Sequence, residues 1–166
     1  MADLHCSIID TNVWAIAEGM HGGASDRCVA ACLSLLNEVE RGSPLAVDTK
    51  DEILAEYVST LDKAGTSGLA VKLAKKLWRT RGDPATCVQV PITPIQDPEG
   101  SYAEVPEHVR DFDSDDQKFL AVAAAEGGNP PLFVGLDGEW WERRGDLTAA
   151  GFDIQFVCPT DLFGTS

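Results

Sequence analysis

Residues 4–13 read LHCSIIDTNV, and this stretch decides how the rest of the chain is interpreted. Its apolar residues predict a short strand over Leu4–Ile9. The polar residues Asp10, Thr11 and Asn12 follow at once and predict a turn where the strand ends. Because ligands of open α/β sheets bind outside the carboxyl ends of the strands, Asp10 is a candidate site residue.

Strands and helices alternate along the rest of the chain. Apolar residues at helical spacing predict helices from Ser25 to Gly42, from about Asp51, over Leu69–Arg79, over Asp115–Glu126 and over Gly138–Arg144. Short apolar runs predict further strands at Pro44–Val47, Cys87–Val90, Leu132–Val134 and Ile154–Val157. Parallel neighbours need crossover connections, which are usually helices. Residues 1–166 are therefore predicted to form one α/β domain, a three-layer α/β/α arrangement with a mainly parallel central sheet.

Residues 83–112 differ from the rest because five prolines interrupt them. Apart from the strand at Cys87–Val90, they are predicted to form a long loop inserted into the domain. Eight acidic residues and one arginine lie between Asp97 and Asp116. This composition is typical of a solvated segment, and less often of a lid or a partner-binding loop.

The charge balance limits the kinds of function that the chain can have. Its 166 residues include 27 acidic and 13 basic ones, which gives a net charge of −14 at pH 7. Such a chain does not coat nucleic acid by general attraction, but carboxylates that gather divalent cations can still act on phosphates. No signal peptide and no membrane-spanning run is legible, so a cytoplasmic protein without a membrane partner is expected.

The five cysteines, Cys6, Cys28, Cys32, Cys87 and Cys158, form an odd set without a CxxC pair. They are predicted to be reduced and mostly buried thiols. Cys28 and Cys32 are one helical turn apart and can hold a metal, although two small apolar residues on a core face are the more common case.

The predicted helix Leu69–Arg79 carries most of the clustered positive charge. Lys72, Lys75, Lys76 and Arg79 lie on the face opposite its leucines. An ordinary solvated face explains this pattern, but in so acidic a chain these four residues are also the candidate contacts to a nucleic-acid backbone.

Acidic residues stand at the ends of two predicted strands and at the start of a helix. Asp10 and Asp137 each follow a predicted strand. Asp116 lies in the first turn of the predicted helix Asp115–Glu126. Ser114 and Gln117 precede and follow it at the spacing of a capping box. Each acid taken alone is explained by capping of the free amides at a helix start.

Glu56 lies on a predicted helix between the core-facing residues Ile53 and Tyr57. Taken alone, an exposed glutamate that faces Thr60 and Lys63 is an equally good interpretation. If several acids converge on one sheet edge, however, their mutual repulsion favours a bound cation.

Four stretches resemble, in order, the four acidic motifs of PIN domains, and the resemblance extends along nearly the whole chain. The stretches are IIDTNV at 8–13, ILAEY at 53–57 with Leu61, DSDDQKFL at 113–120 and VGLDGE at 134–139. The first and third are the specific ones. The fourth has Gly135 where the family usually has Thr or Ser.

The resemblance implies a doubly wound parallel sheet and a nuclease that depends on Mg2+ or Mn2+, most often an endonuclease acting on single-stranded RNA. It implies catalytic roles for Asp10, Glu56, Asp116 and Asp137. It implies that the metal ligands include Asp10, Asp116, Asp137 and, as a further acid, Glu139. Asn12 corresponds to the residue that orients the first aspartate, whereas Asp113 is interpreted as a turn residue.

Two other interpretations stay open. One is a degenerate PIN-like module that binds RNA or a protein without cleaving, and the other is a receiver-like or phosphatase-like α/β domain. Many PIN-domain proteins are toxins that a small antitoxin inhibits, so an antitoxin or other protein partner and a homodimer are further expectations.

Overall fold

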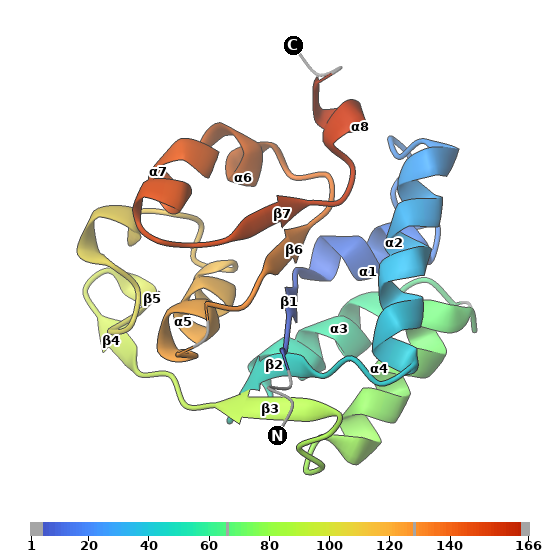
Figure 1. The fold of residues 1–166 in the computed structure, drawn as a ribbon, viewed down its shortest axis with the longest axis horizontal. Helices are drawn as coiled ribbons and strands as arrows, with labels where there is room; N and C mark the ends of the chain where they lie inside the picture. The colour runs from blue at the N-terminus through green and yellow to red at the C-terminus, as the bar shows by residue number, and fades with distance from the viewer. Residues whose placement is uncertain (1–4, 66, 128, 164–166) are drawn as a thin grey trace.

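The computed structural model describes residues 5–65, 67–127 and 129–163. Figure 1 shows the course of the chain. The strands are β1 (Ile8–Ile9), β2 (Leu45–Asp48), β3 (Cys87–Val90), β4 (Pro94–Gln96), β5 (Glu99–Tyr102), β6 (Leu132–Val134) and β7 (Ile154–Phe156). The helices are α1 (Thr11–Ala17), α2 (Asp26–Glu40), α3 (Glu52–Asp62), α4 (Leu69–Thr80), the 3-10 helix η1 (Glu107–Val109), α5 (Gln117–Ala125), α6 (Gly138–Glu142), α7 (Arg144–Ala149) and α8 (Pro159–Phe163).

The strands form small sheets, and most of their pairs are parallel. One sheet has the order β1-β6-β7, a second pairs β2 with β3, and a third is the antiparallel hairpin β4-β5. An isolated parallel bridge between Ser7 and Leu45 lies between the first two sheets. There the Ser7 N–H donates to Pro44 O at 3.2 Å, and the Ala46 N–H donates to Ser7 O at 2.8 Å. The predicted α/β class with parallel strands is confirmed, whereas the single central sheet is not seen as one continuous ladder.

Helix α1 is the main element that the sequence did not predict. The turn expected at Asp10, Thr11 and Asn12 is the first turn of this helix, because the Asp10 carboxylate accepts a hydrogen bond from Asn12 N–H at 3.3 Å and acts as the N-cap. Strand β1 is also shorter than the predicted strand Leu4–Ile9, of which Leu4 lies outside the described residues.

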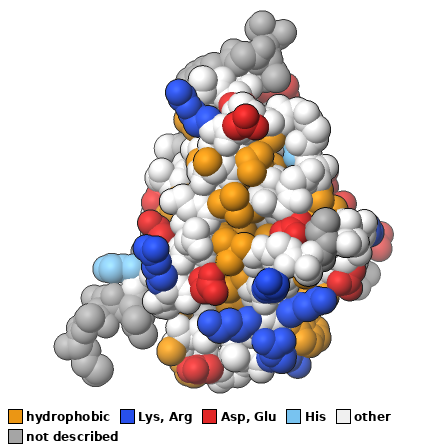
Figure 2. Space-filling view, turned by 90° about the vertical axis from the view of Figure 1, so that its right-hand side faces the viewer, with side chains coloured by type: hydrophobic (Ala, Val, Ile, Leu, Met, Phe, Trp, Pro, Cys, Tyr) orange, Lys and Arg blue, Asp and Glu red, His pale blue; other side chains and the backbone are white. Residues whose placement is uncertain are grey.

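Helix α4 is amphipathic, as its sequence predicted. It buries five small or apolar residues, Ala70, Val71, Leu73, Ala74 and Leu77. Its exposed face carries Lys72, Lys75, Lys76 and Arg79. Lys and Arg side chains gather in the lower part of the face seen in Figure 2, at the height that α4 has in Figure 1.

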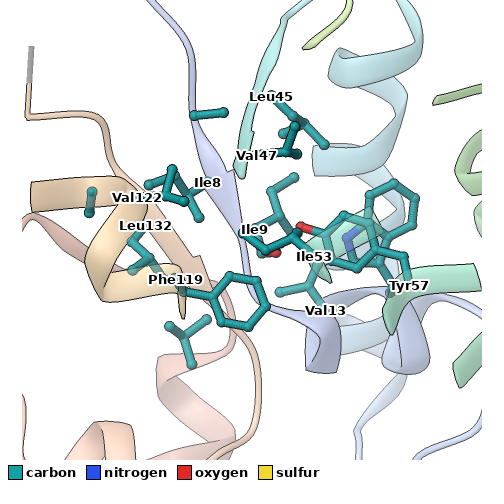
Figure 3. Close-up of a cluster of buried hydrophobic side chains, with 14 of the residues drawn as sticks. Ile8, Ile9, Val13, Leu45, Val47, Ile53, Tyr57, Phe119, Val122 and Leu132 are labelled. Carbon is teal, nitrogen blue, oxygen red and sulfur yellow. The ribbon is translucent and has the colours of Figure 1, made fainter. Parts of the chain in front are cut away.

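The hydrophobic core joins the strands to the helices that follow them. Figure 3 shows Ile9 of β1 between Phe119 of α5 and the side chains of α1 and α3. All of these core residues are buried. The Tyr57 hydroxyl of α3 donates to Ile9 O, and its ring lies 4.6 Å from that of Trp14. The end of β1 is therefore fixed from two sides.

The segment 83–112 is more ordered than the predicted loop. It contains the expected strand β3, but also the β4-β5 hairpin and η1. Tyr102 donates from its hydroxyl to Glu52 at 2.9 Å, and Ser101 donates to the Gln117 side chain at 3.1 Å. Long-range contacts with α3 and α5 hold the hairpin, and a local sequence pattern does not reveal such contacts.

The predicted capping box between Ser114 and Gln117 is wrong. Helix α5 begins at Gln117 with Asp116 as its N-cap and without a side-chain cap bond. The Gln117 side chain is buried instead and donates to the backbone oxygens of Val109 and Phe112 at 3.2 and 2.8 Å. It therefore ties the inserted segment to α5.

The prediction of five reduced cysteines is wrong for two of them. Cys28 of α2 forms a disulfide with Cys158, which lies between β7 and α8. Cys6, Cys32 and Cys87 are free and buried, as predicted. The pairing joins residues 130 positions apart, because the segment after β7 returns to the start of α2.

Within residues 5–65, 67–127 and 129–163, no helix is both long and apolar enough to cross a membrane.

Candidate metal centre

Three predicted acids take up equivalent positions in the fold. Asp10, Asp116 and Asp137 are the N-cap residues of α1, α5 and α6. Asp10 follows β1 and Asp137 follows β6, and these two strands are parallel neighbours. Both residues therefore lie at the same edge of the three-stranded sheet.

The charges of these acids act on one another. Burial raises the pKa of Asp10 to about 7, and the charges of Asp137 and Glu56 add to the shift. Burial likewise raises the pKa of Asp116 to about 8, with further contributions from Asp10 and Asp137. Acids that are far apart in the sequence thus share one region, where full ionisation is unfavourable without a compensating cation.

Glu56 points toward this region, and its side chain is 31% exposed. Its carboxylate accepts hydrogen bonds from the Thr11 hydroxyl and from Lys118 Nζ, the second at 2.9 Å. The interpretation of Glu56 as an exposed glutamate that faces Thr60 and Lys63 is therefore wrong. Because both of its oxygens have protein partners, Glu56 is engaged differently from the three aspartates.

Lys118 is a residue of this site that the sequence did not predict. It lies on α5, is only 9% exposed, and also donates to Asp115 O. Its positive charge lowers the pKa values of Asp10 and Asp116 and partly offsets the effect of burial. The available signal was a lysine within the otherwise apolar helix QKFLAVAAA, since a buried lysine requires a partner.

Asn12 connects two of the stretches that carry acids. Its side-chain oxygen accepts a hydrogen bond from Leu136 N–H at 2.6 Å, and its own backbone N–H donates to Asp10. A Cβ atom added at Gly135 would lie 2.6 Å from Ile16 Cδ1 and closer still to Asn12 Oδ1. Glycine at position 135 therefore leaves room for the Asn12 side chain.

A second grouping of acids includes a residue that the sequence analysis set aside. Asp113, Asp116 and Glu139 each place a carboxylate oxygen within 4.8 Å of the others. Asp113 also accepts from Asp115 N–H at 2.9 Å, which is the predicted turn, and its own N–H donates to Glu139 at 3.2 Å. The residues Asp10, Asp116 and Asp137 do not form so close a trio, and Asp116 belongs to both groups.

The chemistry of these side chains suits a hard divalent ion. Carboxylate oxygens are the ligands that Mg2+ and Mn2+ prefer. Burial, together with the charges of Asp113 and Asp137, also raises the pKa of Glu139. An ion held here would relieve the repulsion that raises these pKa values.

Not every acid at this edge is available to a ligand. Asp48, at the end of β2, is fully buried and was not predicted as a site residue. Its carboxylate accepts hydrogen bonds from the backbone N–H groups of Lys50, Glu52 and Ile53. Asp48 therefore stabilises the start of α3.

The four predicted nucleic-acid contacts lie on a different helix from the acids. Lys72, Lys75, Lys76 and Arg79 are on the exposed face of α4, which packs against α3. Neighbouring Arg81 instead pairs with Asp51 at 3.1 Å.

Comparison with known proteins does not connect the chain to a family, because no family model, no curated protein and no solved structure matches it.

Proposed function

We propose that this chain is a PIN-like, metal-dependent endonuclease that hydrolyses phosphodiester bonds, with single-stranded RNA as its substrate. One observation carries the proposal: acids from distant stretches meet where β1 and β6 end. Besides burial, the charges of Asp137 and Glu56 raise the pKa of Asp10, and the charges of Asp10 and Asp137 raise the pKa of Asp116. Converging acids with raised pKa values are typical of functional sites.

The arrangement of the strands supports a PIN-like doubly wound sheet. The isolated parallel bridge between Ser7, just before β1, and Leu45 of β2 supports a sheet with the order β3-β2-β1-β6-β7. In such an order β2 and β3 are added on one side of β1, and the later strands β6 and β7 on the other side. The switch point of the topology therefore lies between β1 and β6. Doubly wound folds bind ligands in the crevice at this switch point, and Asp10 and Asp137 stand on either side of it.

Each residue of the site has a distinct role in the proposal. Asp10, Asp116, Asp137 and Glu139 hold Mg2+ or Mn2+, and Asp113 is a further ligand candidate. When bound, the ion supplies an activated water and stabilises the charge that develops on the phosphate. Asn12 orients the loop that carries Asp137. Lys118 and Thr11 hold Glu56 at the rim of the site.

The charge distribution of the chain bears on the substrate. In a chain of net charge −14, a phosphate backbone requires a local positive surface. The face of α4 with Lys72, Lys75, Lys76 and Arg79 supplies it, and α4 packs against α3, the helix that carries Glu56. A toxin role with an antitoxin as protein partner is one biological setting of this activity.

A second candidate function is favoured by Lys118. Its ammonium group already pairs with Glu56 and partly compensates the charges of Asp10 and Asp116. An internal cation of this kind can take the place of an ion, as expected for a module that binds RNA or a protein without cleaving it.

The two functions are separated by a cleavage assay on labelled single-stranded RNA and DNA in Mg2+, Mn2+ or EDTA. The nuclease proposal expects cleavage that EDTA abolishes and that Asp10→Asn and Asp116→Asn reduce at least about 100-fold. Asp62→Asn, a change at an exposed acid at the far end of α3, serves as the matched control. Binding without cleavage in all metals would support the second function, and cleavage unchanged in both variants would contradict the proposed site.

A further inference from the structure

Three cysteine sulfurs meet in the interior, at a place that the proposed nuclease does not use. Cys28 and Cys32 lie on successive turns of α2, and Cys158 lies before α8. The three sulfurs are within 4.8 Å of one another, and the residues are only 2%, 0% and 4% exposed. The sequence alone offered Cys28 and Cys32 as a possible pair of metal ligands. The fold adds Cys158, which lies 130 residues beyond Cys28.

The disulfide between Cys28 and Cys158 accounts for two of these sulfurs and leaves the third unexplained. The Cys32 sulfur lies within 4.8 Å of both sulfurs of this bond, and Cys32 is fully buried. Once the bond is reduced, three sulfurs at this spacing can contact one metal ion.

We propose that Cys28, Cys32 and Cys158 form a Zn2+ site when the disulfide is reduced, and that the ion then anchors α8 to α2 in place of the bond. Reduction transfers two electrons and two protons from a dithiol, which is itself oxidised to a disulfide. Zn2+ then displaces one proton from each of the three thiols to solvent, because thiolates are the ligands.

The surroundings provide what a zinc site needs. Cys28 lies in the first turn of α2, whose N-terminal amides favour a negative ligand. Protein-bound zinc is tetrahedral and takes a fourth ligand. The three cysteines leave this position to a water molecule. Asp161 on α8 is not needed as a ligand, because its two carboxylate oxygens accept hydrogen bonds from Ser25 N and Oγ at 2.9 and 2.8 Å.

Cobalt titration tests this site separately from the acidic centre. The whole chain is reduced, freed of metal and titrated anaerobically with Co2+, and the sulfur-to-cobalt charge-transfer absorption is followed. We expect one Co2+ per chain to produce this band and Zn2+ to abolish it. Co2+ bound by carboxylates gives no such band, so the acidic centre does not contribute.

Matched cysteine variants decide the outcome. Cys32→Ser keeps the pair that forms the disulfide and should lower the Co2+ affinity by more than about tenfold, since even an outer partner of a ligand contributes about 10–100-fold. Cys87→Ser removes a buried thiol elsewhere and should leave the band unchanged. The proposal is overturned if the reduced wild-type protein shows no band, or if Cys32→Ser, shown to be folded by the unchanged Tm of its oxidised form, binds as tightly as the wild type.

Discussion

Asp10 and Asp48 occupy equivalent places at the ends of the parallel strands β1 and β2, yet their surroundings differ. Both are nearly inaccessible to solvent, with exposures of 3% and 0%. The Asp48 carboxylate accepts hydrogen bonds from the backbone N–H groups of Lys50, Glu52 and Ile53 at 3.1, 3.0 and 2.9 Å. Its charge is therefore satisfied within the fold.

Asp10 accepts a long hydrogen bond, at 3.3 Å, from Asn12 N–H and lies near Asp137, Glu56 and Asp116. Its pKa is raised to about 7 by burial and by these charges. The same residue type at the same topological position thus stabilises the fold when amides surround it, and is available to a ligand when other acids do.

The largest expected effect is the loss of stability when the satisfied acid is removed. Asp48→Ala removes the acceptor of three N–H groups at the start of α3, of which that of Ile53 is buried, and should lower the free energy of unfolding by about 3–4 kcal/mol. Urea denaturation measures the change. Asp62→Ala, at the exposed end of the same helix, should change it by less than about 0.5 kcal/mol. Equal losses of stability in the two variants would show that Asp48 does not stabilise the start of α3.

A divalent ion bound near Asp10 should raise the free energy of unfolding, whereas loss of the Asp48 carboxylate lowers it. Mn2+ at 100 times its Kd should stabilise the wild-type protein by about 2.7 kcal/mol, because it binds the folded state alone. The Tm at pH 8, compared in Mn2+ and in EDTA, measures the effect. Asp116→Asn should lose most of this stabilisation, whereas a Tm that Mn2+ leaves unchanged in the wild-type protein would argue against a cation site.

Removing the charge of Asp10 should stabilise the protein when no metal is present. Asp10→Asn keeps the shape of the side chain but no longer suffers repulsion from Asp137, so at pH 8 in EDTA the free energy of unfolding should rise by about 1–2 kcal/mol. The same substitution at Asp48 should lower it. If Asp10→Asn destabilises the protein as Asp48→Asn does, the contrast between the two acids is wrong.

Counted per pH unit, the smallest expected effect is the pH dependence of the metal-free protein. The pKa values of Asp10 and Asp116, at about 7 and about 8, lie above the ordinary 3.8. A raised pKa contributes stability while the group is protonated, so the free energy of unfolding should fall as the pH rises from about 5 to about 8. The slope should be at least about 1 kcal/mol per pH unit between about pH 5 and pH 7, where the two groups are protonated mainly in the folded protein. Thermal unfolding in EDTA measures it, and a stability that rises over this range would contradict the shifts.

Local sequence patterns predicted the elements that position the site. The apolar runs before Asp10 and Asp137 are strands, and the helical spacing around Glu56 and after Asp116 is observed. These features depend on neighbouring residues, so the sequence shows them directly.

Features created by long-range contacts were not predictable in the same way. Lys118 pairs with Glu56 across 62 positions, and Tyr102 of the β4-β5 hairpin bonds to Glu52 across 50. Cys158 meets Cys28 across 130 positions, because the segment after β7 returns to α2. No local pattern encodes the partners in these pairs, and tertiary packing decides them.

Titration calorimetry with Mn2+ at pH 8 tests the central claim most directly, because Asp116 belongs both to the acids around Asp10 and to the close group with Asp113 and Glu139. The account predicts that the wild-type protein binds Mn2+ and that Asp116→Asn lowers the affinity at least about tenfold. Equal affinity of the two proteins would show that these acids do not hold a shared cation.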